Sequence, residues 1–192
     1  FTREETVNKL TELIAVADMI VHLAGVNRPV IDAEFTHGNV DLTIAVCNAI
    51  KASERNIPMI FASSTQADIS TPYGRSKKHA EQIVQLLAEE TGNPVSIFRL
   101  PGVFGKWCKP NFNSVVATFC HNIARNIPIQ VSDPDITLDL VYIDDVVNVF
   151  IDKLFNMNRG LDWGQVGPIY NLTLGELVEQ IRYFDECRTS LI

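Results

Sequence analysis

A serine, a tyrosine and a lysine in one short stretch have the types and spacing that proton transfer to a carbonyl oxygen requires. Ser64 ends an apolar run, and Tyr73 and Lys77 follow it in the segment FASSTQADISTPYGRSKKHAE. Because positions four apart share one face of a helix, the ammonium of Lys77 would stand one turn above the phenol of Tyr73. A nearby positive charge lowers the pKa of a phenol, and Ser64 could donate a hydrogen bond to an oxygen that gains charge.

Each part of this pattern also has an ordinary structural explanation. A Tyr and a Lys at this spacing occur by chance on amphipathic helices, and a pair of serines at a strand end is common turn chemistry. The order of the elements favours the chemical interpretation, because a strand over 57–62 leads into the serines and a helix is expected over 73–90. In an α/β protein this brings strand end and helix start together at the carboxyl edge of a sheet, where ligands bind.

The composition argues against several classes of protein. The chain has 192 residues, of which 46% are hydrophobic and 20% charged, and a formal net charge of −7. This charge argues against nucleic acid or an anionic membrane as the main partner. No apolar run reaches the roughly 18–20 residues of a membrane span, and no signal-peptide pattern opens the chain. The four cysteines and four histidines lack the spacing of a disulfide framework or a metal site, so we expect a cytoplasmic protein without a metal.

Apolar periodicity predicts alternating helices and strands along the first hundred residues. Helices are expected over 3–16, 36–53 and 73–90, and buried strands over 18–23, 57–62 and 94–100. Alternation of this kind predicts a parallel sheet with right-handed crossovers. Beyond residue 100 we expect loops over 101–110 and 156–167, short strands over 128–131, 140–143 and 169–172, and helices over 112–126, 144–155 and from Thr173 onward.

Taken together, these motifs resemble the extended short-chain dehydrogenase/reductase family of nucleotide-sugar epimerases, dehydratases and reductases. They occur in family order along nearly the whole chain, at 22–25, Asn39, 63–64, 72–77, Arg99 and 142–145. Three longer stretches are similar to the reductase domain of bacterial capsule and O-antigen enzymes: HLAGVNRP at 22–29, FGKWCKPNFNSVVATFCHNIARN at 104–126 and LVYIDDVV at 140–147. Those enzymes act on the route to UDP-N-acetyl-L-fucosamine.

The resemblance implies a Rossmann-like, doubly wound parallel sheet with a small C-terminal substrate-binding lobe. Residues 1–105 would be a partial dinucleotide-binding domain, and residues 106–192 mainly the lobe, with 128–155 returning to the Rossmann sheet. The sequence contains no G-x-x-G-x-x-G turn of the kind that holds a cofactor pyrophosphate. We therefore expect a fragment that lacks the first two strands of the family, exposes the strand at 18–23 as an edge and binds dinucleotide poorly by itself.

The family's residue roles transfer by position. Tyr73 would protonate the sugar O4, Lys77 would bind the nicotinamide ribose and lower the pKa of Tyr73, and Ser64 would orient the carbonyl, with Ser63 as the competing candidate. Cofactor contacts are implied for Leu23, Ala24, Gly25, Val26, Asn39, Tyr73, Lys77 and Pro101. Substrate contacts are expected from Ser64, Arg28, Lys106 and Asn113. Lys109 could help to neutralise a sugar diphosphate and is equally well explained as a surface residue, and Trp107 is interpreted as a packing residue of the smaller lobe.

The implied activity is NADP(H)-dependent reduction of the C4 ketone of a UDP-linked 4-keto-6-deoxy-hexosamine, by a homodimer that uses NADPH, with NAD as the less favoured cofactor. Dehydratases of the family carry an Asp-Glu pair after the active-site hydroxyl, whereas Thr65 and Gln66 stand here. Gly102 replaces the Asn that often contacts the nucleotide sugar in relatives. Two alternatives stay open: a nucleotide-sugar 4-epimerase, and a non-catalytic dinucleotide-binding module.

Overall fold

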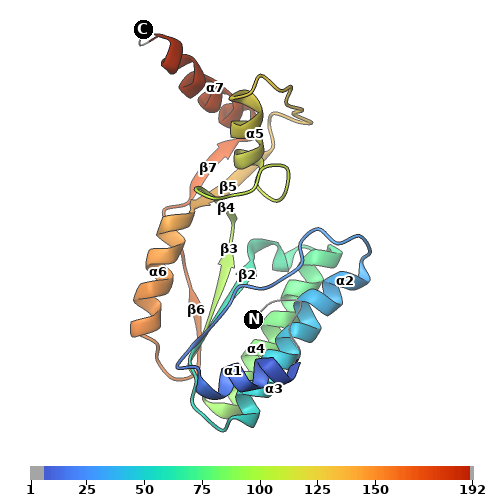
Figure 1. The fold of residues 1–192 in the computed structure, drawn as a ribbon, viewed down its shortest axis with the longest axis vertical. Helices are drawn as coiled ribbons and strands as arrows, with labels where there is room; N and C mark the ends of the chain where they lie inside the picture. The colour runs from blue at the N-terminus through green and yellow to red at the C-terminus, as the bar shows by residue number, and fades with distance from the viewer. Residues whose placement is uncertain (1–6, 191–192) are drawn as a thin grey trace. The chain divides into compact units, whose positions relative to one another are not determined.

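The computed structural model describes residues 7–190, which divide between two compact units that each contain a sheet (Figure 1). The first unit runs to Leu100 and also takes up Val149–Gln165. The second unit contains Pro101–Asn148 and continues from Val166. Within the described residues, no helix has the length and apolar character needed to cross a membrane.

The first unit is built on a four-stranded parallel sheet with the strand order β1-β2-β3-β6. Its strands are β1 (Ile20–His22), β2 (Met59–Ser64), β3 (Val95–Leu100) and β6 (Leu161–Gly164). Its helices are α1 (Val7–Val16), α2 (Ala33–Phe35), α3 (Leu42–Ala52) and α4 (Pro72–Thr91), with a π-helical turn at Thr36–Asp41 and a 3-10 turn at Thr65–Asp68. The β-α alternation and the parallel pairing confirm the predicted α/β fold of Rossmann type.

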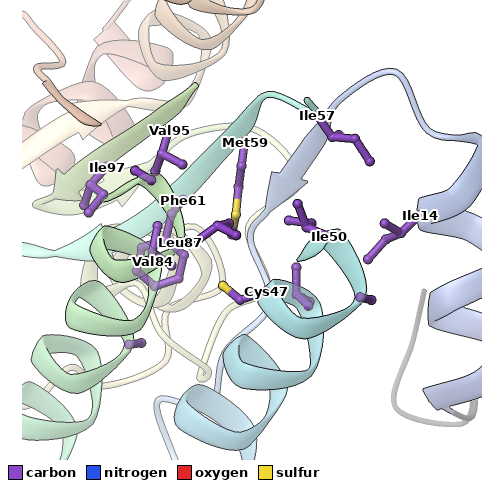
Figure 2. Packing of buried hydrophobic residues seen from close by; sticks show 14 of the residues in the cluster. Ile14, Cys47, Ile50, Ile57, Met59, Phe61, Val84, Leu87, Val95 and Ile97 are labelled. Carbon is purple, nitrogen blue, oxygen red and sulfur yellow. The ribbon is translucent and has the colours of Figure 1, made fainter. Parts of the chain in front are cut away.

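Helices cover both faces of this sheet because its central strands are apolar on both sides. The side chains of Met59, Phe61 and Ile97 point toward α3 and α4 and form the main core with Val84 and Leu87 (Figure 2). On the opposite face, the ring of Phe98 lies 4.7 Å from that of Phe150 in α6 (Ile143–Phe155). Near-continuous burial of β2 and β3 is typical of a parallel sheet enclosed between two layers of helices.

The second unit contains a three-stranded sheet with the order β4-β5-β7. Its strands are β4 (Gly102–Phe104), β5 (Thr137–Tyr142) and β7 (Tyr170–Thr173), and α5 (Val115–Ile123) and α7 (Leu174–Ser190) complete it. A small core forms where Phe119 of α5 meets Leu174, Leu177 and Val178 of α7. Thr173 and Glu176 form the predicted capping box, in which each backbone N–H donates to the other side chain.

Several predictions for the second half of the chain were wrong. The strand predicted at 140–143 is β5, and it joins the second sheet instead of returning to the parallel one. The strand that does return is β6, in the stretch 156–167, which is predicted as a loop because it is rich in Gly and Asn. The segment 101–105 includes β4, whereas 128–131 forms no strand. Ile129 and Val131 are apolar because they pack on the core of the second unit.

The ends of the first-unit elements follow local chemistry. Thr71 caps α4 by accepting a hydrogen bond from the N–H of Gly74, and Gly92 ends the helix with a φ of 70°. Strand β1 lies at one edge of the described sheet, and Val21 on it is 39% exposed. This agrees with the exposed edge expected at 18–23 and not with a strand buried on both sides. The predicted cap and capping-box residues of the first helix, Thr2 and Glu5, lie outside the described residues.

Candidate active site

The two serines at the end of β2 have different partners. Ser63 donates a hydrogen bond of 2.6 Å to the buried carboxylate of Glu81. Ser64 accepts a hydrogen bond from the N–H of Gln66, and its hydroxyl is also hydrogen-bonded to the phenol of Tyr73. Adjacent residues of a strand point to opposite faces of the sheet, which explains why the two serines have different partners. The structure therefore brings Ser64, and not Ser63, to the phenol.

Tyr73 is a half-buried phenol in the first turn of α4. Its ring lies 5.8 Å from that of Phe35 on α2. Burial raises the pKa of Tyr73, and the hydrogen bond with Ser64 opposes that rise. The expectation that Lys77 lowers the pKa of Tyr73 does not hold in this structure. The phenol is consequently a group that keeps its proton over the physiological pH range.

Lys77 carries a buried ammonium, and its side chain is only 6% exposed. The Nζ atom donates a hydrogen bond of 2.9 Å to the carbonyl oxygen of Ala62 and lies 5.3 Å from the centre of the Phe61 ring. Burial lowers the pKa of Lys77 to about 8, and the charge of Glu81 opposes this. The pKa of His22 falls to about 4, chiefly by burial and further by the charge of Lys77. The ammonium is thus held at the end of β2 by the carbonyl oxygen of Ala62 and the ring of Phe61.

The loop after β1 approaches this ammonium at Gly25. A Cβ atom at residue 25 would lie 2.8 Å from Oδ1 of Asn39 and 3.3 Å from Nζ of Lys77. Asn39 fixes the loop, because its side-chain amide exchanges hydrogen bonds of 2.7 and 2.9 Å with the backbone of Val26 and donates one of 2.8 Å to Ser76 of α4. Asn39 therefore holds the backbone of the loop in place. The oxygen and nitrogen of its side-chain amide are both used in hydrogen bonds within the protein.

The exposed loop beside Lys77 fits the nicotinamide-ribose end of a dinucleotide. Leu23, Ala24 and Gly25 are exposed, and a side chain at residue 25 would fill the space next to the ammonium. A dinucleotide could lay its ribose along this backbone, with hydroxyl groups in reach of a buried, charged donor. Among the predicted cofactor contacts, the structure places Gly25 beside Lys77.

The other predicted ligand contacts are distributed over both units. Arg28 is exposed in the loop after β1, and Pro101, Lys106 and Asn113 belong to the second unit. Lys106 forms an ion pair of 2.9 Å with Asp144, which raises the pKa of its ammonium. Trp107 is 93% exposed and lies 5.2 Å from Nζ of Lys106, so its interpretation as a packing residue was wrong.

Sequence reasoning missed Glu81, which lies four residues beyond Lys77 and is 1% exposed. Arg99 from the end of β3 donates to both oxygens of this carboxylate, at 2.8 Å each. Arg99 appeared in the sequence only as a motif position. The signal for Glu81 was available, since it falls among Ala80, Val84 and Leu87 on the apolar face of the helix, where an acidic residue needs a partner.

Gly74 allows the first turn of α4 to lie against the 3-10 turn that follows Ser64. A Cβ atom at residue 74 would lie 2.1 Å from the carbonyl oxygen of Ile69 and 2.4 Å from that of Gln66. Since both are backbone atoms, Gly74→Ala is expected to lower the free energy of unfolding by about 3 kcal/mol in urea denaturation. Gly92→Ala is the control, because a Cβ there meets nothing within 4 Å and only its φ of 70° costs about 1 kcal/mol. Equal losses in the two variants would contradict the close approach.

The parallel sheet, the helices on both of its faces and the Ser64, Tyr73 and Lys77 set at its carboxyl edge define an α/β protein of the short-chain dehydrogenase type. The chain belongs to the NAD dependent epimerase/dehydratase family, which its residues 2–172 match. The family predicted from the sequence is therefore confirmed.

Individual relatives are close enough to compare over the whole chain. A protein of Pseudomonas aeruginosa named UDP-2-acetamido-2,6-beta-L-arabino-hexul-4-ose reductase is 50% identical over 191 residues, which are 100% of this chain and 51% of that protein. The capsular polysaccharide assembling protein CapF from Staphylococcus aureus is 39% identical, with a TM-score of 0.81 over 97% of this chain and 50% of that one. The chain thus spans about half the length of these relatives.

A more distant structure supports the fold alone. MoeE5, solved in complex with UDP-glucose and NAD, has a TM-score of 0.83 and 19% identity over 94% of this chain and 67% of that one. At this identity the likeness confirms the α/β architecture of Rossmann type and carries no argument about substrate.

Proposed function

We propose that this chain forms part of an oxidoreductase that reduces the C4 ketone of a UDP-linked 4-keto-6-deoxy-hexosamine with NADPH. The observation that carries the proposal is the hydrogen bond between Ser64, at the carboxyl end of β2, and Tyr73 on α4. Lys77 lies on the same helix, one turn beyond Tyr73. The Pseudomonas relative supports the substrate class, because its name specifies a UDP-linked hexulose with the keto group at C4 and a reductase activity.

The chain's own residues account for the proton that the reduction consumes. When bound, the reduced nicotinamide supplies the hydride for C4. Tyr73 gives its phenolic proton to O4, so that the ketone becomes an alcohol and the tyrosine is left as a phenolate. Because burial raises the pKa of Tyr73, the proton is present on the phenol when the substrate arrives. Ser64 donates a hydrogen bond to O4, and Lys77 holds the ribose.

The surroundings of Ser64 favour reduction over elimination. Elimination of water from a sugar needs a free carboxylate as a base next to the carbonyl site, and residues 65 and 66 are Thr and Gln. The carboxylate that does lie on this turn, Asp68, is engaged in ion pairs with Lys78 and Arg99. The lack of a carboxylate at residues 65 and 66 and the ion pairs of Asp68 support a reductase or an epimerase over a dehydratase.

The finer parts of the proposal concern ligands, assembly and compartment. The first unit is the dinucleotide-binding part, with Leu23, Ala24, Gly25, Val26 and Asn39 along the cofactor. The second unit contributes the substrate lobe, and Pro101 at its start is a further cofactor contact. Arg28, Lys106 and Asn113 contact the UDP-sugar. The protein acts in the cytoplasm as a homodimer in the synthesis of a capsule or O-antigen sugar, a role that the CapF relative supports by its description as a capsular polysaccharide assembling protein.

Cofactor stoichiometry tests the proposal against the 4-epimerase alternative. In the protein as it is encoded, with any residues that flank this chain, we expect one NADPH oxidised for each ketone reduced, followed by release of NADP+. Absorbance at 340 nm together with product analysis measures both quantities. Interconversion of 4-epimers with a retained dinucleotide and no net oxidation would establish the epimerase instead, and dinucleotide binding without turnover would establish the non-catalytic module.

A further inference from the structure

Glu81 is the centre of a charged cluster outside the set of groups that touch the substrate. Its carboxylate is buried and accepts hydrogen bonds from Ser63 Oγ at 2.6 Å and from Nε and Nη2 of Arg99 at 2.8 Å each. Nζ of Lys78 lies 3.7 Å away. A carboxylate with this many donors is held in one orientation, since both of its oxygens are engaged.

The same cluster ties together the elements that carry the Ser64, Tyr73 and Lys77 set. Arg99 projects from the end of β3 and binds both Glu81 on α4 and Asp68 on the 3-10 turn. That turn begins directly after Ser64, which caps it by accepting from the N–H of Gln66. The ring of Trp163 on β6 lies 5.0 Å from the guanidinium of Arg99 and shields it on that side. Arg99 therefore joins the turn after Ser64 to the helix of Tyr73 and Lys77.

The position of Glu81 also gives it an electrostatic effect on Lys77. It lies one helical turn beyond Lys77, which itself lies one turn beyond Tyr73, and its charge raises the pKa that burial lowers. His22 faces the same ammonium from β1 and is neutral above about pH 4. Tyr73 is neutral while its proton is in place. Glu81 is thus a negative charge that favours the ammonium form of Lys77 in this buried setting.

We propose that Glu81, held by Ser63 and Arg99, is a positioning residue of this site: it clamps the turn after Ser64 to the helix of Tyr73 and Lys77, and it keeps Lys77 charged. The catalytic consequence rests on the proposed function, whereas the effect on Lys77 does not. A buried ion pair that served stability alone could be placed anywhere in the core and gives little net stabilisation. This pair instead joins the segments on which the three polar groups stand.

Glu81→Gln tests the electrostatic part without reference to any substrate. The amide keeps the shape of the side chain and removes its charge. In protein labelled with [ε-13C]lysine, the NMR signal of Lys77, assigned through Lys77→Arg, should titrate at a pH lower by roughly half a unit than in the wild type. Glu89→Gln, which removes an exposed carboxylate from the same helix, should leave this titration unchanged. Identical Lys77 titrations in the wild type and Glu81→Gln would overturn this part.

Kinetics test the clamp. Glu81→Gln should lower kcat for ketone reduction about 10- to 100-fold with little change in KM, and the alkaline limb of the pH profile should move to lower pH. Glu81→Asp, which keeps the charge, should restore the position of that limb. Arg99→Lys should keep the Lys77 titration and still lower kcat, because a lysine cannot bridge Glu81 and Asp68 in the same way.

The outcomes separate this inference from the proposed function. Unchanged kcat in a folded Arg99→Lys variant would overturn the clamp, and this variant also decides the question if Glu81→Gln does not fold. If Glu81 served only the stability of the fold, Glu81→Gln would have a lower melting temperature, but the alkaline limb of its pH–rate profile and its Lys77 titration would be those of the wild type. A wild-type protein that reduces no 4-keto sugar would contradict the proposed function, and the Lys77 titration would still judge the role of Glu81.

Discussion

Replacement of Tyr73 by Phe is expected to lower kcat for ketone reduction by about three orders of magnitude, with dinucleotide affinity changed less than about threefold. The change removes one oxygen from a half-buried ring and leaves the contact with Phe35 in place. Without the phenol, O4 must take its proton from water, and the oxygen loses a donor that Ser64 holds in position. Single-turnover kinetics at saturating NADPH would measure the loss directly.

The control for this variant is Tyr183→Phe, which removes an exposed phenol from α7 of the second unit and should leave the rate unchanged. Tight dinucleotide binding by Tyr73→Phe, measured by calorimetry, would show that its defect lies in proton transfer. A rate for Tyr73→Phe within a few-fold of the wild type would remove Tyr73 from the mechanism and transfer the role of proton donor to another group.

The convergence of Ser64 and Tyr73 was predictable because two local rules place them together. A strand end and the start of the following helix meet at the carboxyl edge of a parallel sheet, and Pro72 with Thr71 marks where that helix begins. Spacing cannot say which of the two adjacent serines meets the phenol of Tyr73 and which meets Glu81. That choice depends on the pleat of β2, and therefore on its register with β3, in which Ser64 pairs with Leu100.

The orientation of Lys77 was less predictable. Helical periodicity places its side chain on the face of Tyr73, but the ammonium is drawn toward the nearest acceptor, the carbonyl oxygen of Ala62. The predicted lowering of the Tyr73 pKa assumed that the charge is directed at the phenol. The direction of a long side chain depends on acceptors supplied by other elements, and these are not encoded by spacing within one helix.

The network around Glu81 depends on topology. Its donors come from β2 and β3, and Arg99 lies 18 residues further along the chain. A buried carboxylate is rare unless it is paired, so the apolar face of α4 indicated that a partner exists but not which one. The wrong assignment of β5 to the parallel sheet has a similar cause, since apolar alternation predicts a strand and does not identify its sheet, whereas the stretch from Val149 onward does return to the first unit.

Replacement of Lys77 by Met is expected to abolish ketone reduction and at the same time to stabilise the fold at neutral pH. The pKa of Lys77 is about 8 in the fold against an ordinary value of 10.5. Because the unfolded chain binds this proton more tightly, the protonated lysine opposes folding. This loss of folding free energy is fully present below pH 8, decreases between pH 8 and 10.5 and vanishes above that range. The difference between the two pKa values corresponds to about 3 kcal/mol. Loss of the hydrogen bond to Ala62 offsets about 1 kcal/mol of the gain.

The slope of stability against pH distinguishes this explanation from a simple gain in hydrophobic contact. Urea denaturation of the wild type between pH 8 and 10 should show a component that rises with pH, and Lys77→Met should lack it. The difference between the two proteins is the quantity to follow, because Cys47, whose pKa is raised to about 12, contributes a fall in both above pH 9. Lys78→Met is the matched control, since its ammonium is about half exposed and should change stability by less than about 0.5 kcal/mol. A Lys77→Met protein less stable than the wild type at pH 7 would show that the ammonium stabilises the fold. That result would contradict the argument that Lys77 is kept for its chemistry although it lowers stability.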